Sequence, residues 1–214
     1  MTRLKDGRRF IDRPIALIDI ETTGSEPHQT GICLLGTPDE INRRCGEISE
    51  IACGLIDPKT FAMADDLYFK VQVINHHDRP DQIQSFDGYN SYNFADWQTA
   101  VPLAEAIERF AAMTNGAVPC SWGTSFERIF IEHAATQTGV TLRLDYHWTC
   151  IMSFALGLFR AGRIGSAAME DSFSLETVAA YFNLPGEPKP HTALGGIQLE
   201  HQVFQQLLHL AQTT

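Results

Sequence analysis

The stretch Ile15-Ala16-Leu17-Ile18-Asp19-Ile20-Glu21-Thr22-Thr23-Gly24 joins an apolar run to two acids and a small polar turn. The apolar run is typical of a buried strand. Side chains alternate between the faces of a strand, so Asp19 and Glu21 share one face, about 6–7 Å apart. Two unpaired buried carboxylates cost several kcal/mol, and a divalent cation between them removes that cost. The stretch therefore predicts half of a Mg²⁺ or Mn²⁺ site. The alternative is a strand that ends at the surface with two solvated acids.

The composition predicts one soluble domain. The chain has 214 residues, 44% of them hydrophobic and 20% charged, enough for a single domain over residues 1–214 with a core at about 14–212. No apolar stretch approaches the roughly 18 residues that span a bilayer, and the N-terminus lacks the apolar core of a signal peptide. We therefore expect a cytoplasmic protein that binds no membrane.

The charge limits the ways in which this chain can bind nucleic acid. A net charge of −10 excludes coating of nucleic acid by bulk electrostatics but leaves room for an enzyme that grips a few nucleotides. Either local binding or solvated surface charge accounts for the basic residues Arg3, Lys5, Arg8, Arg9, Arg13, Arg160 and Arg163.

The five cysteines are odd in number and never in C-x-x-C spacing, which argues against a disulfide framework and fits a reducing compartment. Cys33, Cys45 and His28 form no usual zinc pattern, so buried or idle thiols are the prediction there.

Periodicity and turn signals predict an α/β domain with a mixed sheet. The strands are expected at Ile15–Ile20, Glu47–Asp57, Leu67–Ile74 and Ala117–Trp122. The helices are expected at Trp97–Met113, Gly123–Thr136, Trp148–Phe159, Ser174–Phe182 and Thr192–Gln212. Residues 25–46 form an insertion loop longer than a hairpin needs. The aromatic residues of the polar segment 75–96 either anchor that segment or stack on unpaired bases.

Two further places can bring an acid or a base to the end of the first strand. In Ser121-Trp122-Gly123-Thr124-Ser125-Phe126-Glu127 a strand leads into a helix, and Glu127 lies in its first turns. In Pro190-His191-Thr192-Ala193-Leu194-Gly195-Gly196 a histidine immediately precedes the last helix.

With these motifs the sequence resembles the DnaQ-like (DEDDh, RNase T-like) 3′→5′ exonuclease superfamily. Asp19-Ile-Glu-Thr-Thr-Gly24 matches its first motif, D-x-E-T-T-G, in full. Phe126-Glu127 keeps the Phe of the second motif, with Glu in place of Asp, and Ser121-Trp-Gly123 is similar to the small-RNA-trimming branch. His191-Thr-Ala193 matches the third motif, H-x-A-x-x-D, and Ser174-Leu-Glu-Thr-Val-Ala179 matches the helix that leads into it. Gly196 stands where that motif has its last acid.

The resemblance implies an RNase H-like mixed central sheet flanked by helices, and a metal-dependent 3′→5′ exonuclease that removes nucleotides from single-stranded RNA or DNA ends. It implies two divalent ions, Mg²⁺ or Mn²⁺, or only one if the missing acid matters. His191 would be the general base, and Asp19 and Glu21 would act directly in catalysis, with Glu21 near the terminal 3′-hydroxyl. Related enzymes are often dimers, so a homodimer is expected. The implied substrate contacts are Thr22, Thr23, Gly24, Trp122 and Phe126.

The sequence departs from the superfamily motifs at Glu127 and Gly196, and both departures affect the expected metal ligands. The set expected from the resemblance is Asp19, Glu21 and Glu127. Gly196 supplies no ligand, and Glu200, one helical turn further on the same face, can reach back in its place. Asp145 and Asp171 are weaker substitutes. Two glycines inside a helix also cost about 1 kcal/mol each relative to alanine, so packing must offset them; close approach of a ligand or another backbone would explain them.

Two other functions remain open from sequence. A catalytically impaired exonuclease fold would act as a nucleic-acid-binding module. An RNase H-like nuclease or integrase would cut internally, and the ordered motifs with His191 disfavour it.

Overall fold

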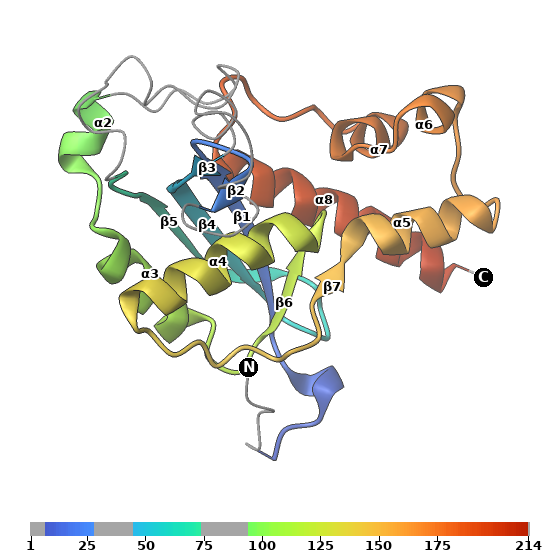
Figure 1. Cartoon of the computed structure of the whole chain (residues 1–214). Coiled ribbons are helices and arrows are strands. Elements are labelled where there is room, and N and C mark those ends of the chain that lie inside the picture. Colours follow the sequence, from blue (N-terminus) through green and yellow to red (C-terminus); the bar gives the residue numbers. More distant parts are fainter. Residues whose placement is uncertain (1–6, 28–44, 74–93, 214) are drawn as a thin grey trace.

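The computed structural model describes residues 7–27, 45–73 and 94–213, and β1 (Ile15–Thr22) lies at the centre of its main sheet. The strand order is β5-β4-β1-β6-β7. β4 (Ile48–Ile56) and β5 (Met63–Lys70) run antiparallel to their neighbours, whereas β6 (Val118–Ser121) and β7 (Thr149–Cys150) are parallel. Helices cover both faces of this mixed sheet (Figure 1). The predicted α/β class, with an RNase H-like central sheet flanked by helices, is confirmed.

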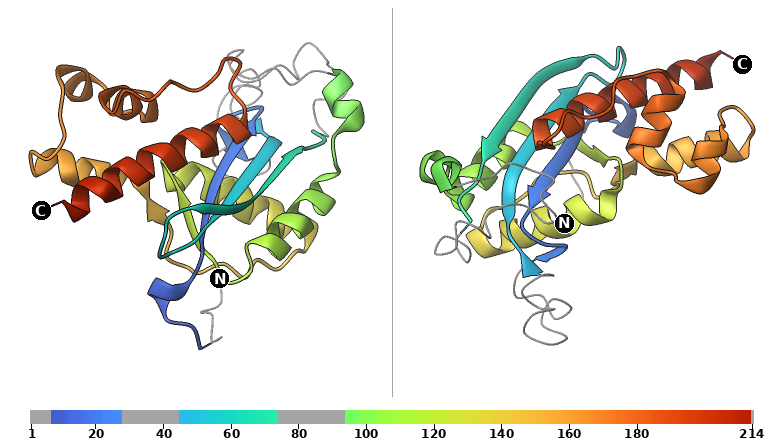
Figure 2. Two further views of the ribbon diagram at one scale, coloured as in Figure 1. Left: turned by 180° about the vertical axis from the view of Figure 1, so that it is seen from behind. Right: turned by 90° about the horizontal axis from the view of Figure 1, so that it is seen from above.

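The alternation of β1 divides the core in two. Ala16, Ile18 and Ile20 pack in one apolar cluster with α3 and α4, whereas Leu17 packs in the other with α5 to α8. Asp19 and Glu21 continue the odd-numbered series, so β1 directs both acids to the face that α8 covers. Figure 2 shows α8 crossing this face, opposite α3 and α4. The helices are α3 (Leu103–Met113), α4 (Thr124–Thr138), α5 (Ile151–Arg160), α6 (Ala167–Asp171), α7 (Leu175–Tyr181) and α8 (Ala193–Gln212).

Capping and turn residues mark the ends of α4 and α8, the two helices that lie next to the acids of β1. α8 begins after Thr192, whose Oγ1 accepts a hydrogen bond of 3.0 Å from the Gly195 amide. α4 follows β6 after a turn at Gly123 and ends at Gly139, whose φ of 72° suits glycine. The short connection from β6 places the first turn of α4 beside the carboxyl end of the central strands.

The predicted helix Trp97–Met113 is wrong as a single element. The chain forms α2 (Phe94–Thr99) and α3, and the segment between them pairs with the sheet edge. The Val101 amide donates to the Lys70 carbonyl at 2.9 Å, and Val101 bridges to Val71. Pro102 then caps α3; since it has no N–H, it suits a helix start rather than a helix interior.

Several smaller elements differ from the predictions. The third strand covers Met63–Lys70 instead of Leu67–Ile74, and Ile74 lies outside the described residues. Residues 149–150, predicted as helix, form β7. The ends of the insertion loop pair as β2 (Glu26–Pro27) with β3 (Cys45–Gly46), and its residues 28–44 lie outside the described part. The short helices η1 (Phe10–Asp12) and α6 were not predicted.

Three of the five cysteines follow the prediction. Cys53, Cys120 and Cys150 are free thiols. Cys45 is disulfide-bonded, and its partner lies outside the described residues, so the prediction of an idle thiol there is wrong. Cys33, His28 and the aromatic residues of segment 75–93 also lie outside them. Among the described helices, none has the length and apolar character to cross a membrane.

Candidate active site

Asp19 lies against the first turns of α8. A Cβ atom at Gly196 would stand 2.7 Å from Asp19 Cγ and closer still to Oδ2. The Asp19 carboxylate therefore occupies the space that a side chain at position 196 would need. Gly196 therefore has a structural reason: the absent side chain allows α8 and the Asp19 carboxylate to meet.

Glu127 and Glu200 bring acids from two other elements. Glu127 lies in the first turn of α4, with 7% of its surface exposed, and its Oε2 accepts a 3.1 Å hydrogen bond from Ser121 Oγ. Glu200, one turn after Gly196, is 2% exposed, and its Oε1 accepts a 2.8 Å hydrogen bond from the Trp122 amide. The structure thus brings both acids to the region of Asp19.

Burial and mutual repulsion shift the pKa values of these carboxylates in the same direction. Burial raises the pKa of Asp19 well above its usual value, and the negative charges of Glu200, Glu21, Glu127 and Glu187 raise it further. Burial also raises the pKa of Glu200, and it raises that of Glu127 to about 7. Each acid resists ionisation in the absence of a positive partner.

His191 lies beside Glu21. Its Nδ1 is 3.0 Å from Glu187 Oε2, and about a fifth of the imidazole is exposed. Glu21, Glu187 and His191 each offer a ligand atom, and these atoms lie within 4.8 Å of one another. The fold therefore brings the predicted base to Glu21, although more than 160 residues separate the two in the chain.

Two acids of this region were missed from sequence. Glu50 is opposite Glu21 in the β1–β4 register and fully buried, and its Oε2 accepts a 3.1 Å hydrogen bond from the Ala193 amide at the start of α8. Only the register between the strands reveals it. Glu187, four residues before His191, was visible in the proline-rich loop, and that spacing was the available signal.

The turn after Glu21 is held by its own hydrogen bonds. Thr22 Oγ1 donates to the Gly24 carbonyl at 2.7 Å, and Thr23 Oγ1 accepts from the Glu47 amide at 2.9 Å. A Cβ at Gly46 would lie 2.9 Å from the Gly24 carbonyl carbon, so the two backbones nearly touch. These contacts fix the turn, and the substrate role of residues 22–24 remains a prediction.

The two aromatic residues predicted to contact substrate pack against the protein. Trp122 stacks on Phe173 with ring centroids 6.5 Å apart, and Phe126 meets Phe130 at 4.9 Å. Both remain half-buried, so part of each ring is open to solvent. Their contact with substrate likewise remains a prediction.

Several other charged residues have roles within the protein. Asp145 lies 2.7 Å from His147 Nδ1 and 3.7 Å from Arg13, so it serves a separate cluster. Arg13 is buried and donates to the Gly116 carbonyl, and Arg163 donates to the Leu210 carbonyl.

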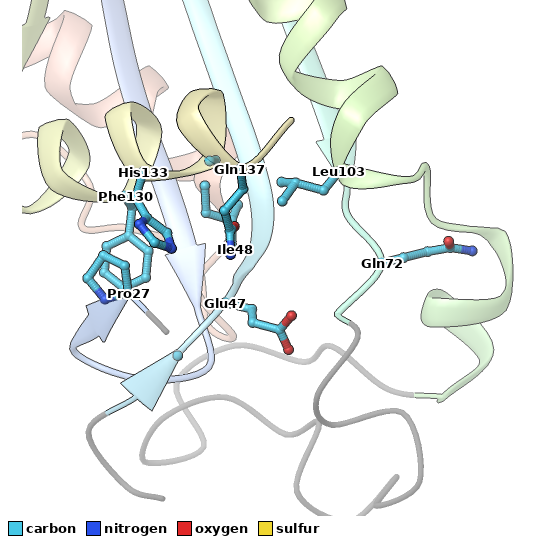
Figure 3. Close-up of a pocket in the computed structure, with 10 residues that line it drawn as sticks. Pro27, Glu47, Ile48, Gln72, Leu103, Phe130, His133 and Gln137 are labelled. Carbon is cyan, nitrogen blue, oxygen red and sulfur yellow. The ribbon is translucent and has the colours of Figure 1, made fainter. Parts of the chain in front are cut away.

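A small pocket lies on the opposite face of the sheet (Figure 3). Pro27, Ile48, Phe130 and His133 line it, and Ile48 and Phe130 belong to the α3–α4 core. Its volume is about 20 Å³, which accommodates about one water molecule. The pocket is therefore distinct from the acids on the α8 face.

Among the described residues, the ligand atoms that all lie within 4.8 Å of one another are those of Glu21, Glu187 and His191. Around Asp19, the chemistry of the donor atoms suits a divalent cation. Glu200 Oε2 is buried and has no hydrogen-bond partner among the described residues. An unpartnered carboxylate oxygen beside a second acid with a raised pKa is costly, and a hard cation with oxygen ligands offsets that cost. The donor set of carboxylate oxygens suits Mg²⁺ or Mn²⁺.

We expect the metal-free protein to lose stability as the pH rises. The pKa of Glu127 is about 7 when folded and about 4.5 unfolded, so folding binds a proton. The contribution of this proton to the free energy of unfolding is fully present below pH 4.5. It is lost as the pH rises through 7, which lowers the free energy of unfolding by about 3 kcal/mol. Thermal unfolding in EDTA between pH 4.5 and 8 measures it. Glu127→Gln should flatten the profile; an equally steep profile in that variant would contradict the assignment.

No protein-family model matches the chain, and no curated protein matches it in sequence. Solved structures do match. The nuclease domain of 3′hExo, a DEDDh family member bound to rAMP, superposes with a TM-score of 0.62 at 13% identity over 92% of each chain. E. coli exonuclease I in complex with a dT13 oligonucleotide gives 0.65 at 13% identity, over 92% of this chain and 40% of that one. Its zinc-bound form with single-stranded DNA gives 0.68 at 12% identity, over 94% and 41%.

The chain has the DnaQ-like exonuclease fold. In this chain, β1 and the first turns of α4 and α8 carry the acids, and the residues just before α8 carry the histidine. At sequence identities of 12–13%, the structural similarity establishes the fold alone. The chemistry must be argued from the side chains of this chain.

Proposed function

We propose that the protein is a divalent-cation-dependent 3′→5′ exonuclease that removes nucleotides from single-stranded RNA or DNA ends. The convergence of acids from β1, α4 and α8 on Asp19, with His191 beside Glu21, carries the proposal. Paired acids with raised pKa values and a neighbouring histidine are typical of sites for phosphodiester hydrolysis. The structural neighbours named as exonucleases support the same function.

The proposed metal ligands are Asp19, Glu21, Glu127 and Glu200, which would hold one or two Mg²⁺ or Mn²⁺ ions. When bound, such ions polarise a phosphodiester and make water more acidic. The chain itself positions the strand end and moves the proton. His191 accepts a proton from the attacking water, a role that suits imidazole near neutral pH. Glu21, on the same side, borders the terminal 3′-hydroxyl.

Glu200 replaces the acid that position 196 lacks. Of the four negative charges that raise the pKa of Asp19, the charge of Glu200 has the largest effect. The carboxylate comes from one helical turn further along α8, and glycine at position 196 leaves Asp19 the room to meet it. This arrangement favours an active enzyme over a site that has lost a ligand.

A 5′-labelled single strand tests the proposal. We expect stepwise shortening from the 3′ end with Mn²⁺ or Mg²⁺, no cleavage in EDTA, and an intact circular single strand because it has no end. Running RNA and DNA side by side determines the preferred substrate. Cutting of the circle would indicate internal cleavage instead. Binding of the strand at low salt without turnover under either metal would favour the impaired binding module.

The single-domain extent, the homodimer and the cytoplasmic location remain predictions of the sequence.

A further inference from the structure

Glu187 makes a short contact with the proposed base. Its Oε2 lies 3.0 Å from His191 Nδ1, and its side chain is 9% exposed. Such a shielded contact between a carboxylate and an imidazole nitrogen is stronger than the same contact in water. The reaction proposed above assigns no task to Glu187.

The start of α8 shapes the place that Glu187 occupies. A Cβ at Gly195 would lie 3.4 Å from Glu187 Cγ and 3.5 Å from its Oε1, so the Glu187 side chain packs at van der Waals distance from the first turn of α8. Burial raises the pKa of Glu187, and the Thr192 amide opposes this. Pro185, two residues before Glu187, and Pro188, directly after it, restrict the loop. Glu187 is therefore carried by a restricted loop and packs against the start of α8.

We infer that Glu187 is a positioning residue, which accepts the Nδ1 proton of His191 and leaves Nε2 as the proton acceptor of the reaction. A neutral imidazole carries its proton on one nitrogen, and the hydrogen bond on that nitrogen selects the tautomer. The same bond fixes the orientation of the ring toward Glu21. The kinetic consequence rests on the proposed function, whereas the tautomer exists in the resting protein without any reaction.

The tautomer is measured in metal-free protein. Long-range ¹H–¹⁵N spectra in EDTA at about pH 8.5, where imidazole is neutral, distinguish a proton on Nδ1 from one on Nε2. We expect His191 to carry it on Nδ1 in the wild type and to lose this preference in Glu187→Ala. A proton on Nε2 in the wild type, or an identical spectrum in the variant, would overturn the inference.

The kinetic consequence separates positioning from metal binding. We expect Glu187→Ala to lower kcat about 10- to 100-fold, with KM, the half-saturating Mn²⁺ concentration and the melting temperature unchanged. Glu187→Gln, which is nearly isosteric and keeps a neutral acceptor, should lose less. A half-saturating Mn²⁺ concentration that rises with the loss of rate would identify Glu187 as a metal ligand and overturn the positioning role.

Glu176→Ala is the matched control. Glu176 is exposed at the start of α7, and its charge acts on Glu187; we expect unchanged kinetics and an unchanged His191 spectrum. A control as slow as Glu187→Ala would show that general charge, and not the contact with His191, matters. If wild-type protein cleaves no strand, the proposed function fails, and the spectra still decide the tautomer.

Discussion

Replacing Gly196 by aspartate, which restores the acid of the family motif, should lower the rate of 3′-end cleavage about 10³-fold or more. The expected rate is the background that Asp19→Ala sets. The reason is steric, because a Cβ at this position falls 2.7 Å from Asp19 Cγ. Any side chain there must displace the Asp19 carboxylate or push α8 away from β1. The added acid also brings another negative charge to a crowded cluster.

Two alanine variants separate the steric effect from the charge. Gly196→Ala should also lose activity and destabilise the protein by about 1–3 kcal/mol, as overpacked sites do. Gly157→Ala, in the helix α5, is the matched control, because a Cβ there meets nothing within 4 Å. It should keep full activity and gain up to about 1 kcal/mol from helix propensity. Cleavage that is faster in Gly196→Asp than in the wild type would show that position 196 does have room for a ligand.

Glu200→Gln should lower the cleavage rate about 10²- to 10³-fold and raise the half-saturating Mn²⁺ concentration. The amide oxygen of glutamine can still accept the Trp122 hydrogen bond, so the fold around position 200 is kept. The change removes the foremost of the negative charges acting on Asp19. Rate and metal affinity should therefore fall together if Glu200 is a ligand.

The same substitution should stabilise the metal-free protein. A buried charge without a positive partner is removed, which we expect to raise the melting temperature in EDTA by about 2–8 °C, or about 1–2 kcal/mol. Glu108→Gln is the control, because Glu108 is an exposed acid of α3. This variant should change neither the cleavage kinetics nor the melting temperature in EDTA. If Glu200→Gln has the kinetics and metal affinity of the wild type, Glu200 is not a metal ligand, and the site lacks one acid.

The sequence was most informative where the geometry of a single strand or helix sets the relative positions of two residues. Alternation along β1 was enough to place Asp19 and Glu21 on one face, because strand geometry alone sets that relation. The helical spacing from position 196 to 200 was enough to indicate Glu200 as a substitute. The predicted boundaries of α4, α7 and α8 also lie within two residues of the observed ones.

Contacts between distant segments explain what the sequence did not reveal. Glu50 joins the site through the register of β1 with β4, and no local pattern specifies a register between strands more than 25 residues apart. Pairing of Val101 with the sheet edge interrupts a stretch of strong helical periodicity, and Pro102 fixes the new start. The meaning of Gly196 required the position of Asp19 on a different element.

Crystals soaked in Mn²⁺ and measured by anomalous scattering test the central claim most directly. We expect at least one manganese ion bound by oxygen atoms of Asp19 and Glu200, with Glu21 or Glu127 completing the set. Manganese found only elsewhere on the protein, with the carboxylates of Asp19 and Glu200 turned away from each other, would contradict it.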